Sequence, residues 1–133
     1  MVFAGKGISN RGDAMAKRVL IVEDEERIRS MYRSALAATG YAVLEAATAG
    51  EGYDHLQRTW VDLVILDIRM PEVDGAALGE VMRQFFRGSK VLVASVYPVE
   101  DQRNMVPGAV DYFDKTEGIE VLVGKVIRHL ELV

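Results

Sequence analysis

Short apolar runs alternate with longer segments of helical periodicity along most of the chain. Val, Ile and Leu dominate the short runs, whereas apolar residues recur every three or four positions in the segments between them. This order repeats five times and is typical of strand and helix units built around a parallel sheet. The pattern predicts strands at Arg18–Val22, Ala42–Glu45, Val61–Leu66, Val91–Ala94 and Val110–Phe113.

The predicted strands differ in how apolar they are, and this difference predicts their places in the sheet. Three are nearly all apolar, as strands that helices cover on both faces must be. The runs at 42–45 and 110–113 are less apolar. We therefore expect these two strands at the edges of the sheet.

The first two helices have signals at their ends as well as apolar stripes. The first stripe comes before Gly40, which ends the helix. Its members are Ile28, Met31, Tyr32, Ala35 and Leu36. Thr48 and Glu51 have the spacing of a capping box, and they begin a second helix that carries Tyr53 and Leu56.

The remaining three helices differ in strength. Asp74 can cap a third helix that ends at Gly88, with apolar residues at Leu78, Val81, Met82, Phe85 and Phe86. Between Pro98 and Pro107 few residues are apolar, so the fourth helix should be short and weakly held. Thr116 can cap the last helix, which has the cleanest stripe. That stripe is Ile119, Leu122, Val123, Val126, Ile127 and Leu130.

Composition excludes several classes of function. The 133 residues contain no cysteine, so disulfides, thiolate metal sites and cysteine nucleophiles are excluded, and we expect a cytoplasmic protein. The formal net charge of −4 gives no reason to expect direct binding to nucleic acid or to an anionic membrane. Asp or Glu interrupts every apolar run well before the roughly 18 residues that a membrane span needs.

The chain divides into a tail and one domain. Residues 1–16 mix Gly, Ser, Asn, Arg and Asp without a continuous apolar segment, so we expect a flexible N-terminal tail and not a signal peptide. Residues 17–133 have the length of a single domain with one hydrophobic core.

Chemically active side chains follow four of the predicted strands. Glu23 and Asp24 come after the first strand, Asp67 after the third, Ser95 after the fourth and Lys115 after the fifth. Ligands of open α/β sheets bind outside the carboxyl ends of the strands, where these side chains would lie. Carboxylates brought together there repel one another unless a cation lies between them. Oxygen ligands without His or Cys favour Mg²⁺ over a transition metal.

Each of these residues also has an ordinary structural explanation when it is taken alone. The acidic run at 23–26 can be the solvated first turn of a helix. Asp67 and Ser95 can be turn residues, and Lys115 can be a surface lysine. Tyr112 can be a half-buried aromatic residue of a strand. Their joint placement at the strand ends is what favours a site.

Four segments of the chain resemble the receiver domain of two-component response regulators. They are VLIVEDEE at 19–26, VDLVILDIRMPEVDG at 61–75, VLVASVY at 91–97 and VDYFDKT at 110–116. One segment alone would be weak evidence, but four in the right order with compatible spacing are specific. The resemblance covers nearly everything after the tail. It implies a three-layer flavodoxin-like (βα)5 fold with a five-stranded parallel sheet of order 2-1-3-4-5.

The resemblance also implies roles for the acidic residues. Asp67 corresponds to the phosphoacceptor, which also contacts the metal. Asp24 corresponds to a direct Mg²⁺ ligand and Glu23 to a ligand that acts through water. Arg69 stands at the position whose backbone carbonyl binds the metal.

The remaining motif residues correspond to groups that act on the phosphoryl group or respond to it. Lys115 and Ser95 would contact phosphoryl oxygens during transfer. Movement of Ser95 toward the phosphoryl group would leave room for the ring of Tyr112 to turn inward. This switch would reshape the face made by the fourth helix, the fifth strand and the fifth helix.

The chain departs from the usual family pattern near the site. Arg69 and Tyr97 stand where the family modulates attack by water, and Val96 stands where a small residue is usual. Because these side chains narrow access to the pocket, we expect slow loss of the phosphoryl group. Thr116 follows Lys115 where proline is common, and we expect a trans peptide bond there.

The function implied is that of a stand-alone receiver, because the last predicted helix ends within a residue or two of the end of the chain. A sensor histidine kinase or a phosphotransfer protein would phosphorylate Asp67, and a downstream protein would bind the switched face. Such a domain is not an enzyme beyond its own phosphorylation and dephosphorylation. No direct contact with nucleic acid or membrane is expected.

Other functions remain open at this point. A receiver that works without phosphate would use the same surface constitutively. A phosphatase of the haloacid dehalogenase type needs a second Asp where Arg69 stands. A flavin-binding protein needs a phosphate cradle after the first strand, where Glu23–Glu26 would repel a phosphate.

Overall fold

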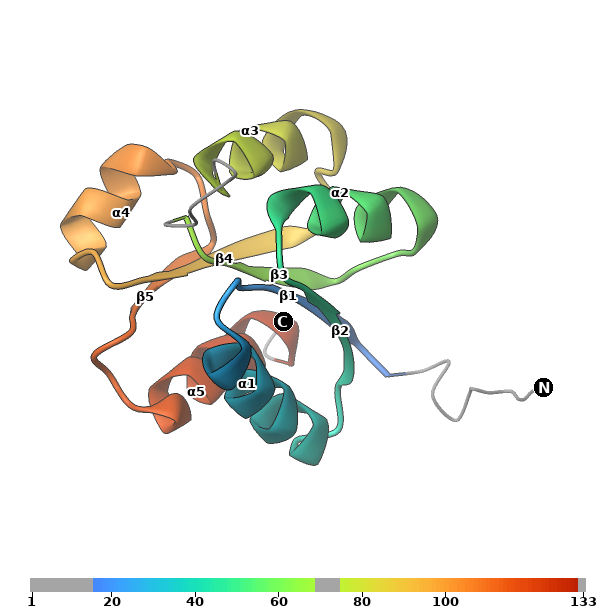
Figure 1. The fold of residues 1–133 in the computed structure, drawn as a ribbon, viewed down its shortest axis with the longest axis vertical. Coiled ribbons are helices and arrows are strands. Elements are labelled where there is room, and N and C mark those ends of the chain that lie inside the picture. The colour runs from blue at the N-terminus through green and yellow to red at the C-terminus, as the bar shows by residue number, and fades with distance from the viewer. Residues whose placement is uncertain (1–15, 69–74, 132–133) are drawn as a thin grey trace.

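The computed structural model describes residues 16–68 and 75–131, which form three layers of secondary structure (Figure 1). Five parallel strands lie in the order β2-β1-β3-β4-β5. They are β1 (Arg18–Val22), β2 (Ala42–Ala46), β3 (Leu63–Leu66), β4 (Lys90–Ser95) and β5 (Asp111–Asp114). The flavodoxin-like order is therefore confirmed, and so is the prediction that β2 and β5 are the edge strands.

Helices cover both faces of the sheet. They are α1 (Glu26–Ala38), α2 (Ala49–Arg58), α3 (Gly75–Phe85), α4 (Val99–Met105) and α5 (Ile119–Leu130). Helices α1 and α5 lie on one face, and α2, α3 and α4 lie on the other (Figure 1). Helix α4 has seven residues, so the prediction of a short fourth helix is confirmed.

The core is divided by the sheet into two apolar clusters. Successive side chains of a strand point to opposite faces. Val19 and Ile21 of β1 therefore join the cluster under α1 and α5, whereas Leu20 and Val22 join the cluster under α2 and α3. All four residues of β3 are buried, as expected for a central strand covered on both faces.

Two helix ends follow the sequence signals. Gly40 adopts a φ of +105°, which a residue with a Cβ rarely adopts, and it lies directly after the turn that ends α1. The hydroxyl of Thr48 accepts a hydrogen bond from the Glu51 N–H at 3.1 Å, and a carboxylate oxygen of Glu51 accepts one from the Ala47 N–H at 2.8 Å. The cap by Thr48 is therefore confirmed, whereas the returning bond of Glu51 goes to the residue before the cap and not to Thr48 itself.

Other predicted ends were wrong. Strand β3 begins at Leu63 and not at Val61, and just before it the carboxylate of Asp62 accepts a hydrogen bond from the Arg18 N–H at 2.7 Å. Strand β5 begins at Asp111 and not at Val110. Thr116 does not cap α5: its hydroxyl donates to Asp114, and Gly118 is the N-cap without a side-chain hydrogen bond.

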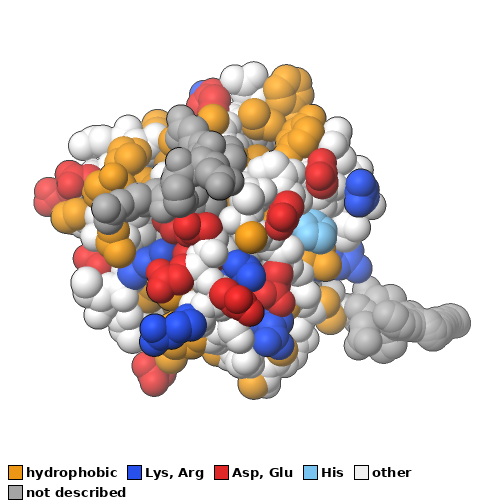
Figure 2. Space-filling model, viewed as in Figure 1, with side chains coloured by type: hydrophobic (Ala, Val, Ile, Leu, Met, Phe, Trp, Pro, Cys, Tyr) orange, Lys and Arg blue, Asp and Glu red, His pale blue; other side chains and the backbone are white. Residues whose placement is uncertain are grey.

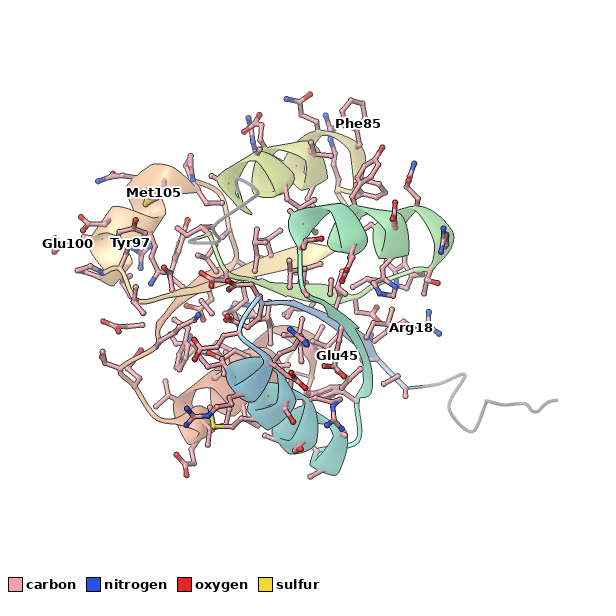
Figure 3. The ribbon with its side chains drawn as sticks, in the orientation of Figure 1. Arg18, Glu45, Phe85, Tyr97, Glu100 and Met105 are labelled. Atoms are coloured by element: carbon pink, nitrogen blue, oxygen red, sulfur yellow. The ribbon has the colours of Figure 1, made fainter. Side chains whose placement is uncertain are left out.

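The predicted stripes are buried except at their margins. Leu122, Val126 and Leu130 of α5 are buried, as predicted. Met31 and Tyr53 are exposed, and Phe85 is 74% exposed at the end of α3, where Figure 3 shows its ring directed away from the ribbon. These three members of the predicted stripes therefore lie outside the core.

Two predictions concern residues outside the described part of the chain. The flexible tail at 1–16 falls almost entirely there, and so does the cap at Asp74. Within residues 16–68 and 75–131, no helix has the length and apolar character needed to span a bilayer.

Candidate functional site

The carboxyl ends of the central strands bring three acidic residues together. Backbone pairing continues one residue beyond the strands, since Glu23 N donates to Ala46 O and Asp67 N donates to Val22 O, both at 3.0 Å. Glu23 is 2% exposed and Asp67 is 4% exposed, whereas Asp24 is exposed. Carboxylate oxygens of the three residues lie within 4.8 Å of one another. The acidic set predicted from the sequence therefore forms one cluster.

Lys115 supplies a positive charge to the same cluster. Its Nζ lies 2.6 Å from Glu23 Oε1 and 3.1 Å from Asp67 Oδ2. The backbone N–H of Lys115 donates to Ser95 O at 2.9 Å, which fixes the lysine next to the end of β4. On the face viewed in Figure 2, acidic and basic side chains lie intermixed near the centre.

Burial and charge act in opposite directions on these groups. Burial raises the pKa of Glu23, and the charge of Asp67 raises it further. The hydrogen bond and the charge of Lys115 lower this pKa, but their effect is smaller than that of burial. Burial alone would lower the pKa of Lys115, but the hydrogen bond to Glu23 and the charges of Asp67 and Glu23 outweigh it and raise that pKa. Lys115 is therefore held in its charged form.

The acidic cluster fits a divalent cation. Three carboxylates and one ammonium carry two net negative charges, which a divalent cation would balance. The donors are hard oxygen atoms, the type that Mg²⁺ prefers. The exposed side chain of Asp24 leaves one side of the cluster open to solvent. Arg69, whose backbone carbonyl the resemblance adds to this set, lies outside the described residues.

Ser95 lies at the end of β4, where its backbone contacts Lys115, and Tyr97 follows two residues later. Ser95 is fully buried, and its hydroxyl accepts a hydrogen bond from the Tyr97 N–H at 3.3 Å. Tyr97 is half-buried and Val96 is exposed. The structure thus brings Ser95 next to Lys115 through their backbone contact, while Val96 faces solvent to a large extent.

Tyr112 is already buried, whereas the resemblance implies that its ring turns inward when the switch occurs. Its hydroxyl donates to Val106 O at 2.6 Å, directly after α4. The guanidinium of Arg103 lies over its ring, 5.0 Å from the centroid. The ring of Tyr112 therefore contacts both Arg103 and the end of α4.

Sequence reasoning missed three residues near the site. Arg29 of α1 donates from Nη1 to Glu23 O at 2.8 Å. Burial raises the pKa of Tyr32 of α1, and the charges of Glu23 and Asp67 raise it further. Gln102 of α4 is fully buried next to the end of β4. No motif marks these positions in the sequence.

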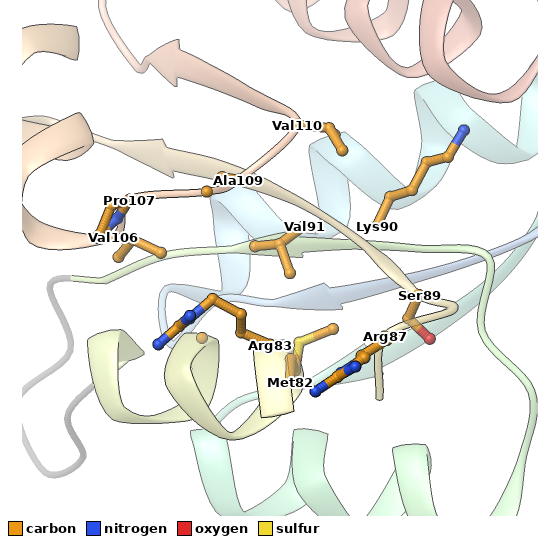
Figure 4. A pocket seen from close by; sticks show the side chains of 12 residues that line it. Met82, Arg83, Arg87, Ser89, Lys90, Val91, Val106, Pro107, Ala109 and Val110 are labelled. Atoms are coloured by element: carbon orange, nitrogen blue, oxygen red, sulfur yellow. The ribbon is translucent and has the colours of Figure 1, made fainter. Parts of the chain in front are cut away.

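A separate hollow of about 280 Å³ lies at the other end of β4 (Figure 4). It is lined by apolar and basic residues that include Met82, Val91, Val106, Arg83, Arg87 and Lys90. Because β4 begins at Lys90 and ends at Ser95, this hollow is distinct from the acidic cluster.

Comparisons with known proteins point to one family. The family model described as response regulator receiver domain matches residues 19–127. The KDP operon transcriptional regulatory protein KdpE of Escherichia coli is 38% identical over 103 residues, which cover 76% of this chain and 45% of that protein. Sporulation initiation phosphotransferase F of Bacillus subtilis is 28% identical and covers 89% of this chain and 97% of its own length.

Solved structures agree with the family model. A receiver domain protein (CheY-like) from Methanospirillum hungatei has a TM-score of 0.78 and 30% identity over 84% of this chain and 90% of its own. Response regulator TrrA from Thermotoga maritima, solved in complex with Mg(2+)-BeF, has a TM-score of 0.79 and 29% identity over 86% of this chain and 99% of its own. The chain spans about half the length of several curated relatives that it matches, which include transcriptional regulators.

Proposed function

We propose that Asp67 accepts a phosphoryl group from a sensor histidine kinase or a phosphotransfer protein, because this chain belongs to the response regulator receiver domain family. The observation that carries the proposal is the buried Asp67 carboxylate, which lies 3.1 Å from the Lys115 ammonium and within one cluster with Glu23 and Asp24. The full-length match to a sporulation initiation phosphotransferase also supports phosphoryl transfer.

The transfer step uses groups of this chain at defined places. A carboxylate oxygen of Asp67 bonds to phosphorus while the bond from phosphorus to the donor breaks, and the electron pair leaves with the donor atom. The product is a mixed anhydride on Asp67. The Lys115 ammonium offsets the negative charge that the phosphoryl oxygens bring. The Ser95 hydroxyl, buried at the end of the adjacent strand, donates to another phosphoryl oxygen.

The acidic cluster holds Mg²⁺ in this proposal. Asp24 and Asp67 would bind it directly and Glu23 through water, while the resemblance adds the backbone carbonyl of Arg69. Bound Mg²⁺ supplies positive charge for the phosphoryl oxygens. The support for this assignment is the oxygen-only donor set and its two net negative charges.

Access to the acceptor sets the lifetime of the phosphoryl group. Tyr97 is half-buried beside Ser95, and Val96 precedes it, while Arg69 lies outside the described residues. We expect these three side chains to screen the anhydride from water, so that the phosphoryl group persists for longer than seconds in the purified protein with Mg²⁺. A half-life of seconds would contradict this expectation.

In this proposal, phosphorylation changes a surface that binds another protein. Tyr112 connects β5 to the end of α4 through its hydrogen bond to Val106 O. Displacement of Ser95 toward the phosphoryl group alters this connection and the face made by α4, β5 and α5. A downstream protein binds that face, with no direct contact to nucleic acid or membrane. The chain acts as a signalling domain and not as an enzyme with an external substrate.

Intact-mass spectrometry tests the proposal. The protein is incubated with a small-molecule phosphodonor and Mg²⁺ beside two controls, Asp67→Asn and a metal-free sample. We expect the mass of one added phosphoryl group in the wild type and in neither control. Addition to Asp67→Asn would show that another residue is the acceptor.

A constitutive binding module is the second candidate function. Tyr112 is buried and its hydroxyl donates to Val106 O, so its ring is held against the end of α4. Such a protein would bind its partner through the same face at all times. This function gains support if no phosphoryl group is added at high concentrations of donor and Mg²⁺.

A further inference from the structure

Helix α4 is attached to the rest of the molecule by a polar side chain. Within Val99–Met105, all of which the structure describes, Gln102 is the only buried residue, and its exposure is 0%. A surface helix ordinarily buries an apolar stripe instead. Val99 packs against the apolar cluster while partly buried, and the Gln102 amide supplies the buried polar contact of α4.

The amide nitrogen of Gln102 faces three backbone carbonyl groups. Nε2 lies 2.8 Å from Tyr97 O, 3.0 Å from Phe113 O and 3.4 Å from Ser95 O. Carbonyl oxygens only accept hydrogen bonds, so the NH₂ end of the amide must face them. Its two N–H groups serve the two shorter contacts. One side chain thus bridges β5 and the segment that follows β4.

The amide oxygen of Gln102 is buried and has no hydrogen-bond partner among the residues that the structure describes. Such an atom destabilises a folded protein, and a methionine of similar length would avoid it. Methionine could not donate to Tyr97 O and Phe113 O, however. The position is therefore explained by the two donors of the amide and not by its packing.

Both backbone segments that Gln102 bridges also form the acceptor site. Ser95 O accepts the backbone N–H of Lys115, and the Ser95 hydroxyl accepts the Tyr97 N–H. Phe113 lies two residues before Lys115 in the chain. A shift of α4 that moves the amide of Gln102 therefore moves Tyr97 relative to the site.

We infer that Gln102 is a positioning residue of the acceptor site. It holds Tyr97 beside Ser95 and so limits the access of water to the phosphoryl group on Asp67. The inference rests on the proposed function, and it assigns the lifetime of the phosphoryl group to a residue of α4 that touches neither the metal ligands nor the acceptor.

The test compares rates of dephosphorylation in four variants. Gln102→Met removes both donors at similar length, and we expect loss of the phosphoryl group to accelerate about five- to thirtyfold, the effect of two ordinary hydrogen bonds. Tyr97→Ala should accelerate it similarly. The double variant should be no faster than the faster single variant, because both changes act through the same side chain. Gln102→Asn, with a shorter amide, should lie between Gln102→Met and the wild type.

Asn104→Met is the matched control. Asn104 is exposed on the same helix, so this variant makes the same kind of change without touching the site, and we expect the wild-type rate. The inference would be overturned if the two accelerations multiplied in the double variant, or if Gln102→Met lost its phosphoryl group at the wild-type rate. In either case, phosphorylation of the wild type would leave the proposed function intact.

A measurement on the unphosphorylated protein tests the role of Gln102 separately from the proposed phosphorylation of Asp67. Nuclear magnetic resonance gives the hydrogen exchange rate of the Tyr97 amide in each variant. We expect faster exchange in Gln102→Met and Gln102→Asn and an unchanged rate in Asn104→Met. If the wild type accepts no phosphoryl group, the proposed function fails, and equal exchange rates in all variants would still overturn the role of Gln102.

Discussion

Helices α4 and α5 are attached to the sheet by different kinds of contact. Helix α5 buries Leu122, Val126 and Leu130 in the cluster that includes Phe113 of β5. Helix α4 buries one amide, that of Gln102, and lies on the opposite face (Figure 1). Apolar contacts have little directional preference, whereas a hydrogen bond weakens steeply with distance and angle.

Because their contacts differ, we expect α5 to stay in place and α4 to move when the acceptor site changes. A small displacement leaves most of the apolar contacts of α5 in place, so α5 acts as a fixed part of the frame. The same displacement breaks the hydrogen bonds of Gln102 to Tyr97 O and Phe113 O. The helix next to the acceptor site is therefore the one that can respond to events there.

Leu122→Ala should have the largest effect, because it breaks the attachment of α5. Leu122 is fully buried, and its truncation should lower the free energy of unfolding by about 3 to 4 kcal/mol. Urea denaturation measures this change. The folded variant should accept a phosphoryl group at the wild-type rate. A loss below about 1 kcal/mol would contradict the apolar attachment of α5.

Asp111→Asn should have the second largest effect and lower the free energy of unfolding by about 2 kcal/mol at neutral pH, because it removes the charged partner of Lys125 and His129 on α5. The carboxylate of Asp111 lies 3.2 Å from Lys125 Nζ and 2.9 Å from His129 Nε2. Burial alone would raise the pKa of Asp111, but hydrogen bonds with His129, the Tyr112 N–H and Lys125 lower it below 3.8.

The pH dependence of this effect has a definite sign. The folded pKa of Asp111 is lowered, so its contribution to stability is present above pH 3.8 and is lost as the pH falls through the folded pKa. Urea denaturation at pH 7, 5 and 3 should show the difference between wild type and Asp111→Asn narrow only at the lowest pH. Asp101→Asn, at an exposed position of α4, is the control with a small effect. A difference that stays constant to pH 3 would contradict the assignment.

Gly124→Ala sharpens the comparison by stabilising α5. Gly124 is exposed within the helix, and a Cβ there would meet no atom within 4 Å. The free energy of unfolding should rise by about 0.8 to 1 kcal/mol. Rates of phosphorylation and dephosphorylation should stay the same, since α5 is already fixed. A change in either rate would mean that α5 moves with the site.

Met105→Ala should have the smallest effect. Met105, labelled on α4 in Figure 3, is the last residue of that helix, and its exposure is 42%. Its truncation should change the free energy of unfolding by less than about 0.5 kcal/mol. Thermal denaturation is sufficient to measure this. A loss comparable to that of Leu122→Ala would show that α4 also depends on apolar contacts.

The sequence predicted the parts of the molecule that depend on hydrocarbon burial and on strand ends. The stripe of α5 and the edge position of β2 follow from periodicity and composition, and the cluster of Glu23, Asp24 and Asp67 follows from residues placed after apolar strands. The strand order was predicted from the resemblance to receiver domains, because the hydrophobic pattern of each segment does not show which strands are neighbours in the sheet.

Polar contacts to the backbone could not be predicted in the same way. Gln102 donates to carbonyl groups of residues 5 and 11 positions away, and such contacts have no period in the sequence. Thr116 looked like a cap because its residue type is common there, but the carboxylate of Asp114 competed for its hydroxyl. The burial of Tyr112 depends on Val106 O, a backbone atom that no residue type reveals.

Hydrogen–deuterium exchange of the phosphorylated and unphosphorylated protein tests the central claim most directly. The claim is that Asp67 receives a phosphoryl group and that α4, not α5, responds. We predict altered exchange in residues 95–106 after phosphorylation and unchanged exchange in residues 119–130, with no change in Asp67→Asn. Exchange that changes equally in both helices, or in neither helix of the phosphorylated protein, would contradict the claim.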